Sequence, residues 1–132
     1  QSIKNFSEVT DITIVKRGPG GVADELVIAT DKGTYKIISE YNIRAVLCDG
    51  VTGVVRQDGS EVSMPNLLPS AFFVIEPSHD KKNVVGYNII GGGFGHGVGM
   101  SQNGAKNMAL QGLDAEQILN FFYEGCEICS GQ

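Results

Sequence analysis

A glycine-rich segment directly ahead of a predicted helix constrains the fold of this chain more than any other feature. Residues 91–109, GGGFGHGVGMSQNGAKNMA, contain seven glycines, one histidine and a Ser-Gln pair. Glycine is needed where φ is positive or where the backbone closely approaches another group. A flexible linker would instead be rich in serine or in low-complexity repeats. The composition therefore indicates a shaped loop, and we expect a functional site in it.

Larger side chains alternate with glycines in this segment, and residues two apart share a face in an extended chain. A lone histidine on an apolar face is more often a hydrogen-bonded structural residue than a catalyst. Ser101 and Gln102 can serve as the N-terminal cap of the following helix, as site residues, or as both. The alternating residues expected to share one face are Phe94, His96, Val98 and Met100.

The first two-thirds of the chain contain short β-branched segments separated by turn residues. Residues 18–21 and 31–33 are rich in glycine and are typical of turns. Ser39 is a suitable cap for a short helical turn through residues 43–47. Strands this closely spaced, without helices between them, favour antiparallel pairing. We expect strands at residues 12–16, 25–30, 34–39, 51–56, 70–76 and 84–90.

The last third is predicted to be helical. Residues 103–111 have helical spacing of apolar positions, and Gly112 suits the position after the helix end. Asp114 and Gln117 have the spacing of a capping box for a second helix. We therefore expect an α+β fold in one domain, residues 1–132, with a mainly antiparallel curved sheet or partial barrel followed by two C-terminal helices. The apolar stripe expected to pack on the sheet consists of Ile118, Leu119 and Phe122.

Composition excludes several classes of function. A net charge of −5 argues against binding to nucleic acid or to an anionic membrane surface. No apolar run approaches the roughly 20 residues needed to span a bilayer, so any anchor or export signal would lie upstream of Gln1. No cofactor is expected, because no G-x-G-x-x-G fits residues 91–104 and no G-K-[ST] occurs.

Three cysteines leave the redox compartment open. Cys126 and Cys129 have C-x-x-C spacing, but a zinc site normally needs two further ligands. Cys48 with His79 or His96 would have to converge on that pair from far away. A local disulfide or two free thiols fits the pair better, and Cys48 fits a small buried hydrophobe. We therefore predict no metal site.

The glycine-rich segment resembles the signature of the bacterial stage II sporulation protein D family, which includes the LytB-type amidase-enhancer proteins. That signature is close to G-R-G-W-G-H-G-V-G-M-S-Q-x-G-A-K-x-M-A, and residues 91–109 follow it nearly position for position. Residues 117–125 resemble the family's Q-I-L-x-x-Y-Y-x-G segment. Weaker likenesses lie at residues 43–47 (I-R-x-x-L) and 68–72 (L-x-S-x-F). The resemblance spans roughly residues 9–128.

Two positions depart from the signature. Gly92 stands where the family usually has arginine, and Phe94 stands where it usually has tryptophan. Without the arginine, position 92 lacks a bidentate hydrogen-bonding group for a carbohydrate or a carboxylate.

The resemblance implies action on bacterial cell-wall glycan. Members of the family have an N-terminal half with a segment like Y-L-x-G-V-V-x-x-E-M, whose glutamate is the catalytic acid of a peptidoglycan lytic transglycosylase. No such segment occurs in these 132 residues. We therefore expect the chain to be the C-terminal portion of such a protein, with the catalytic glutamate in a missing N-terminal half and no catalytic residue in this chain.

The resemblance further implies that this portion forms one wall of a cleft that binds the glycan strand. For the two upstream residues a plain structural role stays open: Arg44 can hold a surface carboxylate, and Ser70 can be a strand-edge hydroxyl. The expected substrate contacts are His96, Ser101, Gln102, Phe94, Ser70 and Arg44, and the expected backbone-shaping residues are Gly93, Gly95, Gly97 and Gly99.

A second class of function stays open beside the enzyme. The chain can be a non-catalytic wall-glycan-binding module or an amidase enhancer. The expected partners are accordingly peptidoglycan glycan strands and, in the second case, a cell-wall amidase. Either case implies an extracytoplasmic location in the cell envelope or wall, with a membrane anchor in an upstream segment.

Overall fold

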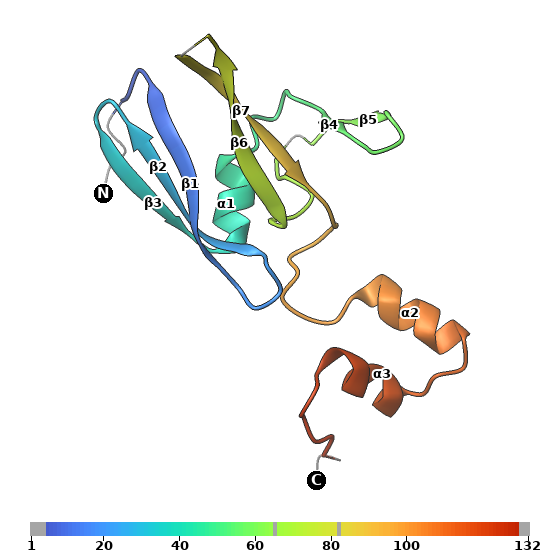
Figure 1. Ribbon diagram of the computed structural model, residues 1–132. Coiled ribbons are helices and arrows are strands. Elements are labelled where there is room, and N and C mark those ends of the chain that lie inside the picture. Colours follow the sequence, from blue (N-terminus) through green and yellow to red (C-terminus); the bar gives the residue numbers. More distant parts are fainter. Residues whose placement is uncertain (1–4, 65, 82, 130–132) are drawn as a thin grey trace. The chain divides into compact units, whose positions relative to one another are not determined.

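The computed structural model describes residues 5–64, 66–81 and 83–129 (Figure 1). The chain divides into two compact units, Gln1–His96 and Gly97–Gln132, and each is described by itself. Within the described ranges the strands pair antiparallel in three separate sheets, none of them closed, and two helices come last in the chain. The predicted α+β class with antiparallel pairing is confirmed.

The first sheet has the strand order β1 (Val9–Arg17), β2 (Ala23–Thr30) and β3 (Gly33–Ile38). Both predicted turns connect these strands. In the first turn Gly21 has φ +82°, and the amide of Gly18 donates to the carbonyl of Val22 at 2.8 Å. In the second, the amide of Lys32 donates to the hydroxyl of Thr30. Local turn chemistry therefore sets the register of this meander.

Helix α1 (Glu40–Val46) closes the core of the first unit. Leu26 and Ile43 are fully buried, and burying such side chains stabilises a fold by about 1.5–3 kcal/mol each. Ser39 is the N-cap residue of α1, as predicted, but it has φ +81° and its side chain makes no capping hydrogen bond. An N-cap side chain reaches the helix amides from the β region of φ and ψ. The backbone of Ser39 instead donates to the carbonyl of Asp24 in β2.

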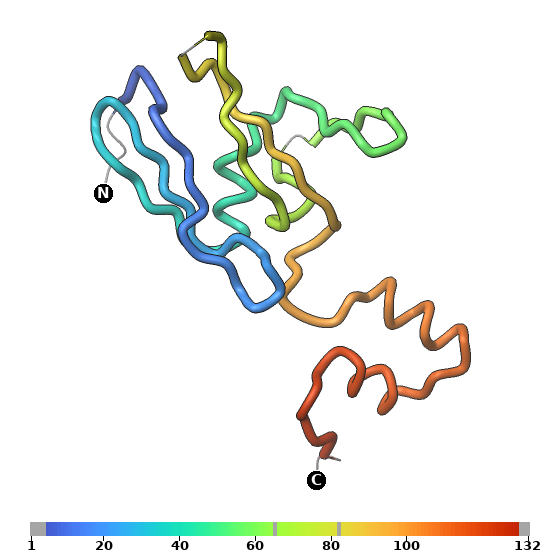
Figure 2. The backbone as a smooth tube through the Cα atoms, viewed as in Figure 1, coloured from blue at the N-terminus to red at the C-terminus, as the bar shows by residue number. Residues whose placement is uncertain are grey.

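Two further hairpins complete the first unit. The short pair is β4 (Val54–Val55) with β5 (Glu61–Val62), and the long pair is β6 (Phe73–Asp80) with β7 (Asn83–Gly91). The tube in Figure 2 follows β7 out of its hairpin into the glycine-rich segment. Phe73 of β6 is buried together with Ala71, so the long hairpin contributes to the core.

Two strands begin later than predicted, for the same physical reason. The Asp49 carboxylate accepts from the amides of Val51 and Thr52, and the Ser70 hydroxyl accepts from the amide of Phe72. Side chains that bind nearby backbone amides compete with strand pairing. The strand expected at 51–56 is therefore reduced to β4, and the one expected at 70–76 begins at Phe73.

The second unit contains α2 (Gln102–Leu110) and α3 (Ala115–Phe122). The predicted helix ends are confirmed: Gly112 has φ +92°, and Asp114 and Gln117 form a reciprocal capping box. The apolar stripe of α3 contacts α2, because a Cβ added to Gly104 would lie 3.0 Å from Cζ of Phe122. Its packing on a sheet stays a prediction.

Candidate functional site

The glycine-rich segment leaves the long hairpin at Gly91 and turns away from strand geometry. Gly93, Gly95 and Gly97 have φ of +83°, +121° and +69°, in the region that side chains rarely adopt. Gly99 lies outside that region. Because positive φ interrupts the extended chain, residues 92–101 form no strand. The prediction that Phe94, His96, Val98 and Met100 share one face of an extended segment is therefore wrong, because the segment is not extended.

Gly91 has a different reason to be glycine. A Cβ added there would lie 2.4 Å from the carbonyl oxygen of Phe72 and 2.5 Å from Cβ of Phe73. A Cβ at neighbouring Gly92 would meet nothing within 4 Å, and the φ of Gly92 is not positive. Position 92 therefore has room for a side chain, which agrees with the arginine usual at this place in the family signature.

Phe94 and His96 lie on the surface of the first unit. The ring of Phe94 is 88% exposed, and His96 is also exposed. Phe94 lies between Gly93 and Gly95, both with positive φ, so the backbone turns on either side of it. An exposed aromatic ring on a constrained turn offers an apolar face for a ligand.

Ser70 connects the glycine-rich segment to the loop ahead of β6. Its hydroxyl donates to the carbonyl of Gly92 and accepts from the amide of Phe72 at 3.1 Å. The amide of Gly92 donates to the carbonyl of Phe72 at 3.0 Å. Ser70 itself is buried, whereas its partners Phe72 and Gly92 are exposed residues. The two segments are thereby joined beyond the end of the hairpin.

Arg44 of α1 holds the same loop from the other side. Its side chain is only 10% exposed, and its Nη1 forms an ion pair with Glu40 at 3.1 Å. Nε donates to the carbonyl of Leu68 at 2.8 Å, and Nη2 donates to that of Pro69 at 3.3 Å. The carbonyl of Pro69 also accepts from the amide of Gly95 at 2.9 Å. The first unit thus brings Arg44, Ser70 and the glycine-rich segment together; direct contact of Arg44 or Ser70 with a glycan stays a prediction.

The remaining predicted contacts lie in the second unit. Ser101 is the N-cap of α2, and its hydroxyl accepts from the amide of Gly104 at 3.1 Å. Gln102 is the first residue of that helix and is exposed. The capping role open to Ser101 is therefore realised, and it leaves the hydroxyl proton available for a further bond.

Sequence reasoning missed the part played by Tyr123. Its hydroxyl accepts from the amide of Met100 at 3.1 Å, and a Cβ added to Gly99 would lie 3.1 Å from the same oxygen. The tyrosine after α3 therefore fixes the chain entering α2. Its place in the run 117–125, which resembles a family segment, was the signal in the sequence.

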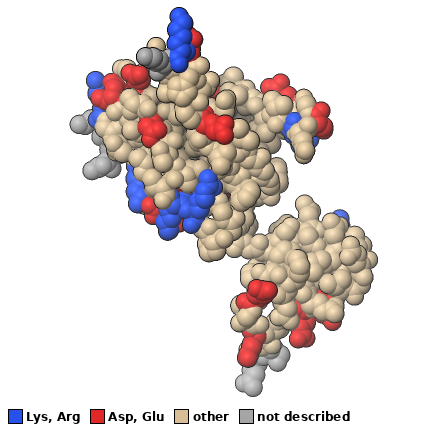
Figure 3. Space-filling model, in the orientation of Figure 1, with Lys and Arg blue, Asp and Glu red and all other residues tan. Residues whose placement is uncertain are grey.

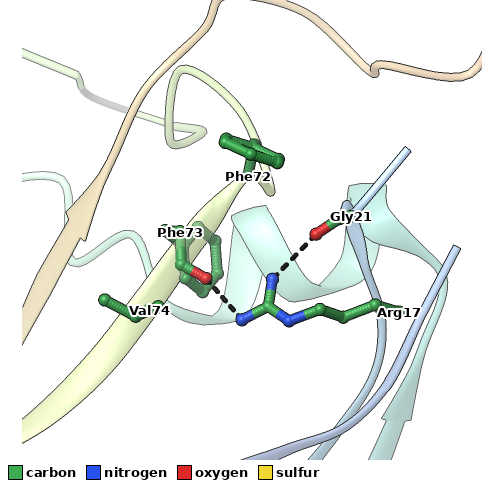
Figure 4. A pocket seen from close by; sticks show the side chains of 5 residues that line it. All are labelled: Arg17, Gly21, Phe72, Phe73 and Val74. Atoms are coloured by element: carbon green, nitrogen blue, oxygen red, sulfur yellow. Dashed lines mark hydrogen bonds between the residues drawn. The ribbon is translucent and has the colours of Figure 1, made fainter. Parts of the chain in front are cut away.

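A shallow hollow of about 310 Å³ on the first unit was also missed. Figure 4 shows the side chain of Arg17 extending from β1 beneath Phe72, with its guanidinium bound to the carbonyls of Gly21 and Phe73, both at 2.8 Å. A Cβ on Gly21 would lie 2.8 Å from the ring of Phe72. Phe72, Phe73 and Val74 make the lining of the hollow mainly apolar, and the guanidinium of Arg17 lies at its edge.

Figure 3 shows acidic and basic side chains on the visible face of the first unit, with basic side chains gathered along its lower edge. Lys16 pairs with Asp24, and Lys36 pairs with Glu25. In the second unit Lys106 is outnumbered by acidic residues.

Two side chains of the first unit have a shifted pKa. Hydrogen bonds from Thr52 lower the pKa of Asp49. Burial raises the pKa of Tyr87, and the negative charge of Asp11 adds a smaller effect.

The cysteines are free thiols. Cys48 is half-buried and donates to the carbonyl of Met64, whereas Cys126 and Cys129 are exposed. Of the two alternatives predicted for Cys126 and Cys129, a local disulfide or two free thiols, the structure shows two free thiols. The described ranges contain no group of three or more His, Cys, Asp or Glu residues placed to hold a metal ion. In the same ranges, no helix combines the length and apolar character needed to cross a membrane.

A family model described as a domain of unknown function, DUF8618, matches residues 1–99. The chain belongs to this family. The match covers most of the chain and runs into the glycine-rich segment as far as Gly99.

Curated relatives extend the comparison. The stage II sporulation protein D of Bacillus subtilis is 53% identical over 36 residues, 27% of this chain and 10% of its own length. The amidase enhancer of Bacillus subtilis is 48% identical over 50 residues, 38% of this chain and 7% of its own length. An uncharacterized protein of Brachyspira hyodysenteriae is 41% identical over 75 residues, 57% of this chain and 19% of its own length.

These relatives confirm the predicted likeness to the stage II sporulation protein D family. The chain spans less than a fifth of the length of the relatives it matches. No solved structure matches it.

Proposed function

We propose that this chain binds peptidoglycan glycan strands and belongs to a protein with a cell-wall-related role. The single observation that carries the proposal is the exposed Phe94 on a turn built by Gly93 and Gly95, beside His96 in a segment similar to the family signature. The names of the relatives, stage II sporulation protein D and amidase enhancer, support the coarser cell-wall role.

The contacts proposed for a glycan divide by chemistry. Phe94 offers an apolar face for a sugar ring, because aromatic rings carry large apolar surfaces. The imidazole of His96 is a polar ring of a kind that can bind sugar hydroxyl or N-acetyl groups. Ser101 keeps a hydroxyl proton for a ligand while it caps α2, and Gln102 offers an amide. Within the first unit, a polar imidazole close in sequence to an exposed aromatic ring has the composition typical of small-molecule sites; the contacts of Ser101 and Gln102 are proposed for the second unit by itself.

For the whole protein we propose lytic transglycosylase activity. The 6-hydroxyl of N-acetylmuramic acid would attack its own anomeric carbon and break the bond to N-acetylglucosamine, giving a 1,6-anhydro product. An intramolecular nucleophile has a large entropic advantage. One carboxyl group therefore suffices, since it gives its proton to the leaving oxygen of N-acetylglucosamine and then accepts the proton of the 6-hydroxyl, whereas glycoside hydrolases use two carboxylates. We propose that this acid is a glutamate in another segment of the protein.

The glutamates of this chain support that assignment. A carboxylic acid that donates a proton at neutral pH needs an apolar environment. Glu25 is ion-paired with Lys36, and Glu40 is ion-paired with Arg44. The other glutamates are exposed to solvent: Glu8, Glu61, Glu76, Glu116, Glu124 and Glu127.

A histidine pair tests the binding proposal. The chain has two histidines, and both are exposed. His96→Ala should lower the affinity for peptide-free glycan strands by about fivefold, the value of one hydrogen bond, with little change in thermal stability. His79→Ala, in β6, is the matched control and should bind as the wild type does. Equal affinity of all three proteins would contradict a role for His96; a large loss of stability with unchanged affinity would make it a structural residue.

A second experiment tests the reaction. The 132-residue chain alone should release no anhydro-muropeptides from peptidoglycan without stem peptides, while the longer protein should release them. Replacing the proposed glutamate by glutamine in the longer protein should abolish release and leave glycan binding intact. Release of anhydro products by the chain alone would overturn the proposal that the catalytic glutamate lies in another segment of the protein.

The relative named amidase enhancer favours a second candidate function, a non-catalytic module that stimulates a wall amidase. In this case the longer protein would release no anhydro products, and adding it to an amidase digest would accelerate the release of stem peptides. Both functions place the protein outside the cytoplasm at the cell envelope or wall, with an anchor in another segment, which fractionation of cells would test.

A further inference from the structure

Hydrogen bonds join three chain segments of the first unit. They are α1, the loop at residues 68–72 and residues 91–95 of the glycine-rich segment, which include Phe94. Each link between them is a hydrogen bond to backbone, and the side chains that form them, Arg44 and Ser70, are buried. Groups buried in this way are poorly placed to touch a ligand, although they control the backbone that carries Phe94.

Arg44 acts on the segment through one shared carbonyl. Its guanidinium donates to the carbonyls of Leu68 and Pro69, and the carbonyl of Pro69 also accepts from the amide of Gly95. In return, the amide of Leu68 donates to the carbonyl of Arg44 at 3.3 Å. The ion pair with Glu40 compensates the buried positive charge. A planar fork of donors is needed for this geometry, and lysine does not supply one.

Ser70 acts on the other end of the same turn. Its hydroxyl donates to the carbonyl of Gly92 and accepts from the amide of Phe72. Phe94 therefore lies between two anchored residues, Gly92 and Gly95, with positive φ at Gly93 and Gly95. Glycines with positive φ have many accessible conformations when they are not held, so these anchors decide which one the turn adopts.

We propose that Arg44 and Ser70 are positioning residues: they hold residues 92–95 in one conformation, so that Phe94 and His96 meet the glycan in a fixed geometry, and they do not touch the glycan themselves. The inference rests on the proposed function and deepens it. It differs from the prediction of direct contact, because a positioning residue loses its effect on affinity when the residue it positions is removed.

A double-mutant cycle separates the two roles. The affinity for a tetrasaccharide of alternating N-acetylglucosamine and N-acetylmuramic acid is measured for Ser70→Ala, Phe94→Ala and the double variant. Ser70→Ala should lower the affinity about fivefold in the wild type and by clearly less once Phe94 is alanine, because only the positioning of His96 is then left to lose. Additive losses would overturn the proposal, since a serine that binds the glycan directly loses its contact in either background.

Amide hydrogen exchange in the unliganded chain gives a readout that a ligand contact would not change. In Ser70→Ala the amides of Gly92 and Gly95 should exchange several-fold faster than in the wild type, while the amides of β2 stay unchanged. Ser78→Ala, a half-buried serine in β6, is the matched control and should change neither exchange nor affinity. Unchanged exchange at both glycines in Ser70→Ala would overturn the proposal.

Arg44→Lys tests the other anchor while keeping the charge that faces Glu40. It should accelerate exchange at Gly95 more than at Gly92, because the carbonyl of Pro69 binds only the former. Should this variant fail to fold, Ser70→Ala carries the test alone. If the wild-type chain does not bind the tetrasaccharide, the proposed function fails, and exchange at the two glycines then decides whether Arg44 and Ser70 hold the segment.

Discussion

Replacing Gly91 by alanine should damage the long hairpin more than any other single methyl group added to the glycine-rich segment. The new Cβ would lie 2.4 Å from the carbonyl oxygen of Phe72 and 2.5 Å from Cβ of Phe73. Both are closer than van der Waals contact allows, and both belong to a neighbouring chain segment that cannot rotate away. Phe73 is buried in the core and cannot move aside. The added methyl group would therefore push β7 away from β6 at the pair Phe73–Gly91.

The expected size of the effect follows from overpacking. Forcing an extra carbon into a well-packed site typically costs about 1–3 kcal/mol. For a unit of this size, 1 kcal/mol lowers the melting temperature by roughly 4–8 °C. Gly91→Ala should therefore lower the melting temperature by at least about 4 °C, and on the order of 20 °C if the full cost is felt.

The neighbouring residue provides the control. Gly92→Ala adds the same methyl group where nothing lies within 4 Å and where φ is not positive. Replacing glycine by alanine at such a position leaves stability unchanged or raises it by up to about 1 kcal/mol, because the unfolded chain loses freedom. Thermal unfolding followed by circular dichroism compares the two variants. Equal melting temperatures would refute the argument that Phe72 and Phe73 exclude a side chain at position 91.

Three further predictions concern the same unit and the segment that leaves it. Gly95→Ala and Gly97→Ala should each cost about 1 kcal/mol in urea unfolding because their φ is positive, and Gly92→Ala should cost less because its φ is not positive and nothing lies within 4 Å of the added Cβ; equal losses would contradict this. Gly92→Arg should fold normally and bind peptide-free glycan about tenfold more tightly, and an unchanged affinity would remove position 92 from the site. The pKa of the Tyr87 hydroxyl is raised in the folded chain, so the unfolded chain loses the hydroxyl proton at lower pH than the folded chain does. The free energy of unfolding should therefore fall as pH rises above about 10 and stay constant below it. Tyr87→Phe should abolish that fall in urea unfolding measured at several pH values.

Tyr87 also shows how the tertiary structure departs from local rules. Its hydroxyl is buried and has no hydrogen-bond partner among the residues that the structure describes. A buried hydroxyl without a partner costs stability, so Tyr87→Phe should not destabilise the fold at neutral pH. Nothing in the alternation of β7 residues foretells this, because burial of the hydroxyl depends on packing against other strands.

Much of this protein could be predicted from the sequence, because the deciding interactions are local. The capping box of α3 joins residues three apart, and the turn at residues 18–21 closes over a few peptide bonds. Positive φ at Gly93, Gly95 and Gly97 agrees with a glycine spacing that is visible in the printed chain, although Gly99 continues that spacing without positive φ. Such features depend on the intrinsic conformational preferences of the residues involved, and neighbours along the chain satisfy them.

Other features depend on which distant segments meet, and only the tertiary structure decided them. Arg44 lies 24 residues from Leu68 and Ser70 lies 22 from Gly92, yet these pairs form the hydrogen bonds that hold the glycine-rich segment. A sequence names the donors and acceptors that are present, but a buried donor is satisfied by whichever acceptor the packed core brings to it. The sequence by itself therefore determined that residues 91–99 form a shaped loop, and the tertiary structure determined what holds that loop in shape.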